Sequence, residues 1–568
     1  MHINVIPNRG AAPTILLRES FRDGTKVCKR TLANLSALSA AQVQMIRGAL
    51  RGDVLQAVEK TFEVIASPAH GHVQAVFLAM QRLGFASVLA SKPSRERDLV
   101  LAMVASRIIC PATKLATTRL WSVSTLAQEF GVSDADEDEL YAAMDWLLAG
   151  QDRIQKKLAA RHLKEDSLVL YDLSSSYFEG VQCPLAKLGY SRDGKRGTLQ
   201  VNYGLLTDDR GCPVAISVYE GNTSDSTTFV PQVKRLREEF GIASMVMVGD
   251  RGMISQKAID EMSKDTDVAW ITALRSSSIG TLVEQGHLQM DLFDERNLLE
   301  ISSPDFPGER LVACRNPELA KLRVHTRNDL LLATEKELEK IKLRVESAKL
   351  VGKDKIGVAA GKVVNRYKVS KHFELTITDD ALSFARLQDS IAAEAALDGL
   401  YIIRTSVQAQ RMDAPTCVRT YKSLAQVERA FRSIKTMDLK VRPIHHHLEN
   451  RVRAHIFLCM LAYYVEWHMR EAWREMIFSD VDQDAKLIRD PVAPAQRSDE
   501  AMKKGQSRTL DDGTPVHSFQ TLMATLAGIV RNTCRTPGGR ADAPTFEITT
   551  THNPQQKRAL ELIGQIKM

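Results

Sequence analysis

Residues 421–435 read YKSLAQVERAFRSIK, and three polar side chains in this stretch recur at intervals of seven: Tyr421, Glu428 and Lys435. Seven residues are just under two turns of an α-helix, so the spacing predicts one helix that carries all three along one face. A neighbouring row keeps the i, i+3, i+7 spacing of a buried face and consists of Leu424, Val427, Phe431 and Ile434. The stretch therefore predicts a carboxylate held at the edge of a core.

Glu428 also has an ordinary explanation. Arg432 follows it by four residues, and an i, i+4 ion pair would account for a glutamate on a helix surface. A catalytic role for Glu428 requires acidic partners elsewhere in the chain.

Two aspartates follow short apolar runs of the kind that form buried strands. The run LVLY at 168–171 precedes Asp172, and the run MVMV at 245–248 precedes Asp250. Glycines flank Asp250 in the sequence GDRG, where backbone or ligand can approach closely. Three carboxylates gathered without a cation would raise at least one pKa, and oxygen ligands suit Mg²⁺ or Mn²⁺. We expect Asp172, Asp250 and Glu428 to form a metal site.

Such a site predicts phosphodiester chemistry. Two divalent ions about 3.5–4 Å apart can activate a water or a 3′-hydroxyl and stabilise the leaving oxygen. Tyr421 and Lys435 would then contact phosphate oxygens through a hydroxyl and a point charge.

The apolar runs predict a mixed α/β sheet with parallel and antiparallel strands. A helix should open at Ser224 or Asp225, with Asp225 more probable as a cap than as a catalytic group. The predicted strands lie at 168–171, 199–206, 213–219, 245–248, 268–274 and 399–404.

The chain divides into six predicted segments. They are a basic N-terminal element (1–70), a helical domain (71–160), the first part of the sheet (161–279), an α+β insertion (280–398), the second part of the sheet with the Glu428 helix (399–475), and a linker with a helical C-terminal element (476–568).

Within the helical domain, residues 126–133, LAQEFGVS, resemble a helix-turn-helix corner. The acidic run that follows would be repelled by DNA, which favours helical packing or a dimer surface for this segment.

Basic side chains near these segments are candidates for DNA contact. The N-terminal stretch contains Arg9, Arg18, Arg22, Lys26, Lys29 and Arg30, although a solvated face would explain them equally well. Further candidates are Arg192, Lys195, Arg196, Arg251, Arg429, Arg432 and Arg451. The adjacent histidines 445–447 cannot converge on one ion in regular structure and do not predict zinc binding.

Composition sets the class of protein. The 568 residues are 44% hydrophobic, have a net charge of +7 and include no apolar run as long as a membrane span. Eight cysteines occur without a CxxC pair, which favours reduced thiols over zinc ligands or disulfides. We expect a cytoplasmic protein with no membrane segment, built from three or four units.

The ordered set of Asp172, Asp250 and Glu428 resembles the DDE transposases of bacterial insertion sequences. More narrowly, it is similar to the branch with a Tyr-x2-Arg-x3-Glu-x6-Lys signature and a β-rich insertion before the glutamate. Leu424 stands where that signature has arginine, so a phosphate contact would fall to Arg429, Arg432 or a basic loop. The resemblance covers residues 160–470 best.

The resemblance implies an RNase H-like catalytic core that uses Mg²⁺, or Mn²⁺ in its place. It further implies cleavage at the terminal inverted repeats of a double-stranded DNA element and joining to target DNA, by a homodimer in the bacterial cytoplasm. One alternative is a DNA-binding protein derived from a transposase with weak or no catalysis, which the three intact carboxylates disfavour. Another is a phosphohydrolase, which usually needs an aspartate where Ser174 stands.

Overall fold

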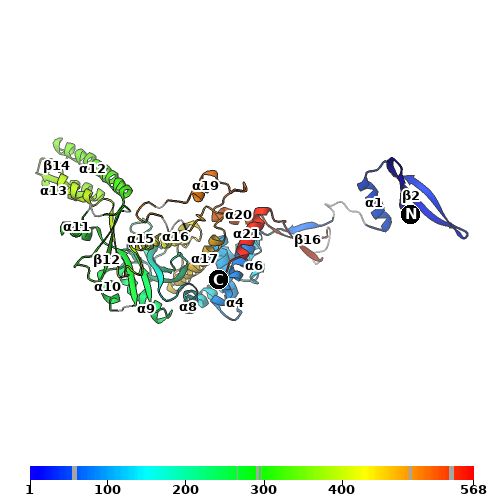
Figure 1. Cartoon of the computed structure of the whole chain (residues 1–568), viewed down its shortest axis with the longest axis horizontal. Helices are drawn as coiled ribbons and strands as arrows, with labels where there is room; N and C mark the ends of the chain where they lie inside the picture. The colour runs from blue at the N-terminus through cyan, green and yellow to red at the C-terminus, as the bar shows by residue number, and fades with distance from the viewer. Residues whose placement is uncertain are drawn as a thin grey trace. The chain divides into compact units, whose positions relative to one another are not determined.

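The computed structural model describes residues 1–53, 61–264, 267–289, 293–295, 297–484, 489–494, 496–536 and 543–567. The chain forms two compact units (Figure 1). The smaller contains residues 1–68 and 529–551, and the larger contains residues 69–528 and 552–568.

The smaller unit contains two three-stranded antiparallel sheets. In the first, β1 (His2–Asn8), β2 (Ala11–Asp23) and β3 (Lys26–Asn34) pair in chain order, and α1 (Ala40–Arg51) follows. In the second, β16 (Arg531–Arg535) lies between β4 (Glu63–Ala66) and β17 (Thr545–Thr549). The prediction of a helical C-terminal element is therefore wrong for residues 529–551, and the basic element predicted at 1–70 contains β1–β4 and α1 in its described residues. The pairing of β4 with a strand more than 460 residues later has no local sequence signal.

The larger unit begins with the predicted helices. The acidic run after Gly131 serves the fold: Asp136 caps α7 with a capping box, and Arg95 contacts both Asp134 and Glu139. The helices are α2 (Gly71–Arg82), α3 (Phe85–Leu89), α4 (Arg95–Ile109), α5 (Lys114–Leu120), η2 (Trp121–Val123), α6 (Leu126–Glu129), α7 (Glu137–Ala149) and α8 (Gln151–His162).

In the ranges that the structure describes, no single helix is long and apolar enough to cross a membrane. The helical segments 95–109 and 114–123 together have the length and apolar composition of a membrane span, but the chain bends by 86° between them.

A nine-stranded mixed sheet forms the centre of the larger unit, as the sequence predicts. Its order is β11-β12-β15-β10-β9-β5-β7-β6, with β8 paired to β7. Neighbours β5, β9 and β10 are parallel, and the other pairs are antiparallel. The strands are β5 (Ser167–Tyr177), β6 (Lys187–Leu188), β7 (Leu199–Thr207), β8 (Pro213–Glu220), β9 (Met245–Val248), β10 (Val268–Ala273), β11 (Leu298–Ile301), β12 (Arg310–Arg315) and β15 (Leu400–Thr405).

Helices cover the sheet because its central strands are apolar on both faces. All four residues of β9 are buried, and Met245 and Met247 pack in one cluster with α9 (Asp225–Glu238) and α10 (Gln256–Met262). The helix α11 (Ser276–Glu284) follows β10 and contacts β15.

The insertion contains helices and a β-hairpin, which agrees with the predicted α+β segment, but it is shorter than predicted. The strands β11 and β12 extend the main sheet, so the insertion proper spans 317–396, and it is mainly helical rather than β-rich. Figure 1 shows α12 (Pro317–Glu346) and α13 (Lys353–Tyr367) side by side, with a separate hydrophobic cluster. The hairpin of β13 (Phe373–Ile377) and β14 (Leu382–Arg386) completes it, together with η3 (Ser370–His372) and α14 (Gln388–Ala396).

The predicted single helix over 421–435 is three pieces. A turn at Ser423, whose hydroxyl donates to the Thr420 carbonyl, separates α15 (Ala414–Lys422) from α16 (Leu424–Arg432). The π-helical turn η4 (Ser433–Met437) follows, where the Ser433 hydroxyl donates to the carboxylates of Asp438 and Glu466. These tertiary contacts override the helical period.

The described residues after η4 contain four helices. The apolar helix α17 is buried along most of its length and packs against β8 and α7. The four are α17 (Glu449–Ala472), α19 (Asp499–Ser507), α20 (Phe519–Ala527) and α21 (Pro554–Gly564).

Candidate active site

The two aspartates lie at the same end of two parallel strands. The strands β5 and β9 are parallel, and Leu170 pairs with Val248. Asp172 and Asp250 each lie two residues beyond that pair. Asp172 remains within β5, which continues alongside β7, and is half-buried. Asp250 lies in the turn after β9 and is exposed.

Local packing fixes the turn that carries Asp250. The Gly249 amide donates to the Ile271 carbonyl at 3.2 Å, and a Cβ on Gly249 would lie 3.1 Å from the Ile254 side chain. The Arg251 amide donates to Asp250 Oδ1 at 2.7 Å. The sequence GDRG thus places its aspartate by close packing at the first glycine.

Glu428 reaches this region from α16, which packs against β5. Its side chain is exposed, and it makes no hydrogen bond or ion pair with any residue that the structure describes. The i, i+4 pair with Arg432 does not form. From the preceding helix, the Tyr421 hydroxyl donates to Asp250 Oδ1 at 3.4 Å.

The carboxylates share one electrostatic environment. Burial is the main cause that raises the pKa of Asp172 to about 7; the charges of Asp250 and Glu428 also raise it, and the Leu173 amide and Arg192 oppose the rise. Burial, followed by the charge of Asp250, raises the pKa of Tyr421. Three anionic groups therefore face a common region.

The carboxylates fit a hard divalent cation. They supply only oxygen ligands, and Glu428 has no competing partner among the described residues.

Lys435 lies behind this edge rather than on it. Its side chain is 10% exposed, and its ammonium lies 2.8 Å from Asp193 Oδ1 and donates to Ser174 Oγ at 2.9 Å. Burial lowers its pKa. Arg442 also pairs with Asp193. The structure gives Lys435 protein partners, and its predicted phosphate contact stays a prediction.

Sequence reasoning did not identify Asp193. The Asp193 carboxylate accepts a hydrogen bond from the Tyr177 amide at 3.2 Å and pairs with Lys435 and Arg442. It therefore connects the loop after β6 to β5. No motif marks it, because an aspartate followed by glycine is typical of any turn.

The loop around Asp193 borders a pocket of about 350 Å³. Arg192 in its wall contacts Asp225 Oδ1 at 2.5 Å. Asp225 is the first residue of α9, and the N-cap residue Ser224 makes no side-chain capping hydrogen bond. The predicted capping role of Asp225 is therefore wrong, because its carboxylate pairs with Arg192 instead. Gly252, beside Asp250, also lines the pocket.

The remaining basic candidates fall into two groups. Arg196, Arg251, Arg429 and Arg432 are exposed, and their side chains make no hydrogen bond or ion pair with described residues. Lys195 lies over the Tyr177 ring, 3.5 Å from its centroid. Arg451 stacks on Tyr141 at 4.4 Å and approaches Asp145 at 4.0 Å, which gives it a packing role.

Two comparisons with known proteins returned matches. The family model described as transposase DDE domain matches residues 165–465, just over half of the chain. The solved structure of the piggyBac transposase synaptic complex with hairpin DNA is similar at 9% identity and a TM-score of 0.34, over 80% of this chain and 78% of that chain. A search of curated proteins finds no match.

Proposed function

Because the chain belongs to the transposase DDE domain family, we propose that it is the transposase of an insertion sequence. In this proposal it cuts element ends and joins them to target DNA by metal-dependent hydrolysis and transesterification of phosphodiesters. The observation that carries the proposal is the placement of Asp172 and Asp250 at equivalent positions of two parallel strands, with an unpaired Glu428 on the helix that packs beside them.

The parallel strands β5, β9 and β10, flanked by antiparallel β7 and β8, support an RNase H-like core. Asp172, Asp250 and Glu428 would hold Mg²⁺ or Mn²⁺. When bound, such ions supply an activated oxygen nucleophile and charge stabilisation at the leaving oxygen. The Tyr421 hydroxyl orients Asp250, and the half-buried position of Asp172 limits access of water to one side of the cluster.

The unpaired arginines support binding of double-stranded DNA near this site. Arg251 follows Asp250 directly, and Arg429 and Arg432 lie on the helix of Glu428. Charges left without protein partners are available to phosphates. Arg429 and Arg432 would replace the arginine that the resemblance places at Leu424. We further propose a homodimer acting in the bacterial cytoplasm on terminal inverted repeats and target DNA.

The test is cleavage of DNA that carries the ends of the element, by the purified full chain with Mg²⁺. Asp250→Asn and Glu428→Gln should each reduce cleavage roughly 10³-fold, because each removes a charge that stabilises the transition state through the cation. Binding to the same DNA should stay within about threefold of the parent. Glu284→Gln, an exposed carboxylate on α11, is the matched control and should cleave normally.

Chelation separates the proposal from its alternative. EDTA should abolish cleavage and leave most DNA binding. A parent protein that binds the ends tightly but does not cleave them with Mg²⁺ or Mn²⁺ would instead be a DNA-binding derivative of a transposase. Normal cleavage by Asp250→Asn would remove the assigned site altogether.

A further inference from the structure

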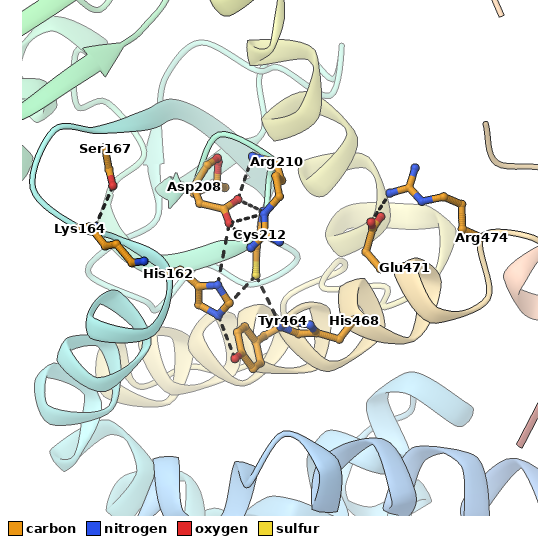
Figure 2. Close-up of polar contacts among 11 residues, drawn as sticks. His162, Lys164, Ser167, Asp208, Arg210, Cys212, Tyr464, His468, Glu471 and Arg474 are labelled. Atoms are coloured by element: carbon orange, nitrogen blue, oxygen red, sulfur yellow. Dashed lines mark hydrogen bonds and ion pairs between the residues drawn. The ribbon is translucent and has the colours of Figure 1, made fainter. Parts of the chain in front are cut away.

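Three metal-ligating side chains meet in the interior of the larger unit, away from the carboxylates. His162 is the last residue of α8, Cys212 lies in the turn between β7 and β8, and His468 lies on α17. Figure 2 shows the three side chains pointing toward one another. Their ligand atoms all lie within 4.8 Å of one another. Nothing in the proposed DNA chemistry uses them.

The distances in this cluster suit a metal better than a hydrogen bond. Cys212 Sγ lies 3.9 Å from His162 Nε2 and 3.8 Å from His468 Nε2 (Figure 2). Zinc bonds of about 2.3 Å to sulfur and 2.0–2.1 Å to nitrogen separate a sulfur and a nitrogen ligand by about 3.6 Å in a tetrahedron and about 3.8 Å in a trigonal plane. The observed separation of 3.8 Å falls within this range, and the separation of 3.9 Å is 0.1 Å beyond it.

The surroundings orient the ligands. The Asp208 carboxylate accepts the Cys212 amide at 2.8 Å and lies 3.9 Å from Nδ1 of His162. The opposite nitrogen, Nε2, faces the Tyr464 hydroxyl at 3.0 Å and the Cys212 sulfur. At 3.9 Å the Asp208 carboxylate does not hydrogen-bond His162 Nδ1, so its effect on that ring is electrostatic, whereas its bond to the Cys212 amide positions the turn that carries Cys212. Asp208 thus acts on two of the three ligands.

Burial indicates a closed site. Cys212 is 0% exposed, His468 is 8% exposed and the His162 side chain is 4% exposed. Arg210 is held by Asp208 at 2.8 Å with its guanidinium over the Trp467 ring. A closed set of one sulfur and two imidazole nitrogens is typical of structural sites for d¹⁰ ions, not of sites for Mg²⁺.

We propose that His162, Cys212 and His468 bind a structural Zn²⁺ ion, with the Tyr464 hydroxyl beside the fourth position and Asp208 as the positioning residue. On binding, the Cys212 thiol loses its proton to solvent and the sulfur forms a bond to the metal. The ion ties the end of α8 and the β7–β8 turn to α17, so it fastens the sheet between two helices that are more than 300 residues apart in sequence.

The test uses the full chain, stripped with a chelator and then exposed to ZnCl₂ or CoCl₂. The parent should retain about one equivalent of Zn²⁺, and its Co²⁺ form should show a sulfur-to-cobalt charge-transfer band. Cys212→Ser and His468→Gln should each lower Zn²⁺ affinity at least tenfold, and Cys212→Ser should remove the band. Cys459→Ser is the matched control, because Cys459 is a fully buried cysteine on α17 outside the cluster.

Asp208→Asn tests the positioning role. It should lower Zn²⁺ affinity about 10–100-fold while the cobalt band persists at saturation, because every ligand remains. Failure of the parent to bind Zn²⁺, or an unchanged band in Cys212→Ser, overturns the proposal and makes the cluster a hydrogen-bonded contact only. Binding of Cu⁺ without Zn²⁺ overturns the choice of metal. Loss of Glu428 should change none of these readouts, so the result is independent of the proposed DNA chemistry.

Discussion

Asp172 differs from Asp250 in one physical respect, the burial of its carboxylate. The sequence predicts a raised pKa from the meeting of three like charges. In the structure burial is the larger cause and the neighbouring charges add to it. The difference arises because β5 continues past Asp172 alongside β7, whereas β9 ends before Asp250. Strand length beyond a charged residue cannot be read from an apolar run that stops at it.

The pKa of Asp172 predicts a pH-dependent stability. The folded state keeps the proton up to about pH 7, whereas the ordinary carboxyl value is 3.8. Stability without metal should therefore fall as pH rises from about 4 to about 7 and then level off. Asp172→Asn keeps an oxygen that accepts the Leu173 amide but has no carboxylate to ionise, so its stability should not fall over this pH range. At pH 8 its free energy of unfolding should exceed that of the parent by about 1–2 kcal/mol, a value reduced to allow for solvent screening.

Urea denaturation at pH 4.5 and at pH 8 measures this difference. Glu284→Gln serves as the exposed control and should show no such pH dependence relative to the parent. Added Mg²⁺ should stabilise the parent at pH 8 and leave Asp172→Asn unchanged. Equal stability of parent and Asp172→Asn at both pH values would show that burial does not raise this pKa.

Lys435, in the π-helical turn η4, has a structural role that its seven-residue interval from Glu428 does not predict. Lys435 keeps the predicted interval from Glu428, but its ammonium lies between Ser174 and Asp193 inside the protein. Removing one partner of a buried ion pair leaves the other charge uncompensated.

Lys435→Met should therefore destabilise the chain by about 2–3 kcal/mol, since Arg442 still partners Asp193. The double variant Lys435→Met/Asp193→Asn should lose less than the sum of the single variants, as thermal or urea unfolding can measure. Lys257→Met, an exposed lysine on α10, is the control. Unchanged stability of Lys435→Met together with weaker DNA binding would support direct phosphate contact instead.

The insertion behaves as a separate element. Arg315 and Leu400 pair across β12 and β15, so the two ends of the insertion are adjacent, and its helices have their own hydrophobic cluster. Replacing residues 317–396 with a short Gly-Asn turn closes a hairpin. We expect the shortened protein to remain soluble and folded, with a thermal midpoint within about 5 °C of the parent. Circular dichroism and calorimetry check this. Aggregation would show that the sheet depends on α12.

Elements with strong local signals were predictable, and their partners were not. The run at 245–248 and the strands near 199 and 213 match the structure within a residue or two. The strand β12 lies within the segment predicted as an insertion, and its place in the main sheet depends on pairing with β15, about ninety residues later. The division of 421–435 depends on Ser433 contacting Glu466, another nonlocal contact.

At the scale of the molecule, the basic N-terminal residues lie on an exposed hairpin. Arg22, Lys26 and Lys29 are exposed on β2 and β3 and make no ion pair with described residues, whereas Arg30 pairs with Glu19. The charge is therefore available to a polyanion, as DNA contact requires, and it is equally compatible with the solvated face that the sequence also allows.

Arg22→Ala/Lys26→Ala/Lys29→Ala should weaken binding to DNA of any sequence. It should reduce the slope of log K against log salt by about 3, because about 0.9 counterions are released per phosphate contact. Fluorescence anisotropy at several salt concentrations measures the slope. Val27→Ala, also exposed on β3, is the uncharged control. An unchanged slope would leave these residues a solvated surface.

The His162–Cys212–His468 cluster could not be predicted from the sequence. No spacing motif joins its members, because three distant segments bring them together, whereas the conspicuous histidines 445–447 do not converge. Buried ligands from separate elements carry no periodic signal.

The pairing of β4 with β16 has a consequence for synthesis. Ser67 bonds to Asn532 across 465 residues, so among the described residues β4 has no strand partner until β16 has left the ribosome. At about 5–20 residues per second, that delay is about 20–90 s. During this interval the backbone N–H and C=O groups of β4 lack the partners that β16 provides. A nascent chain interrupted before residue 531 never acquires them.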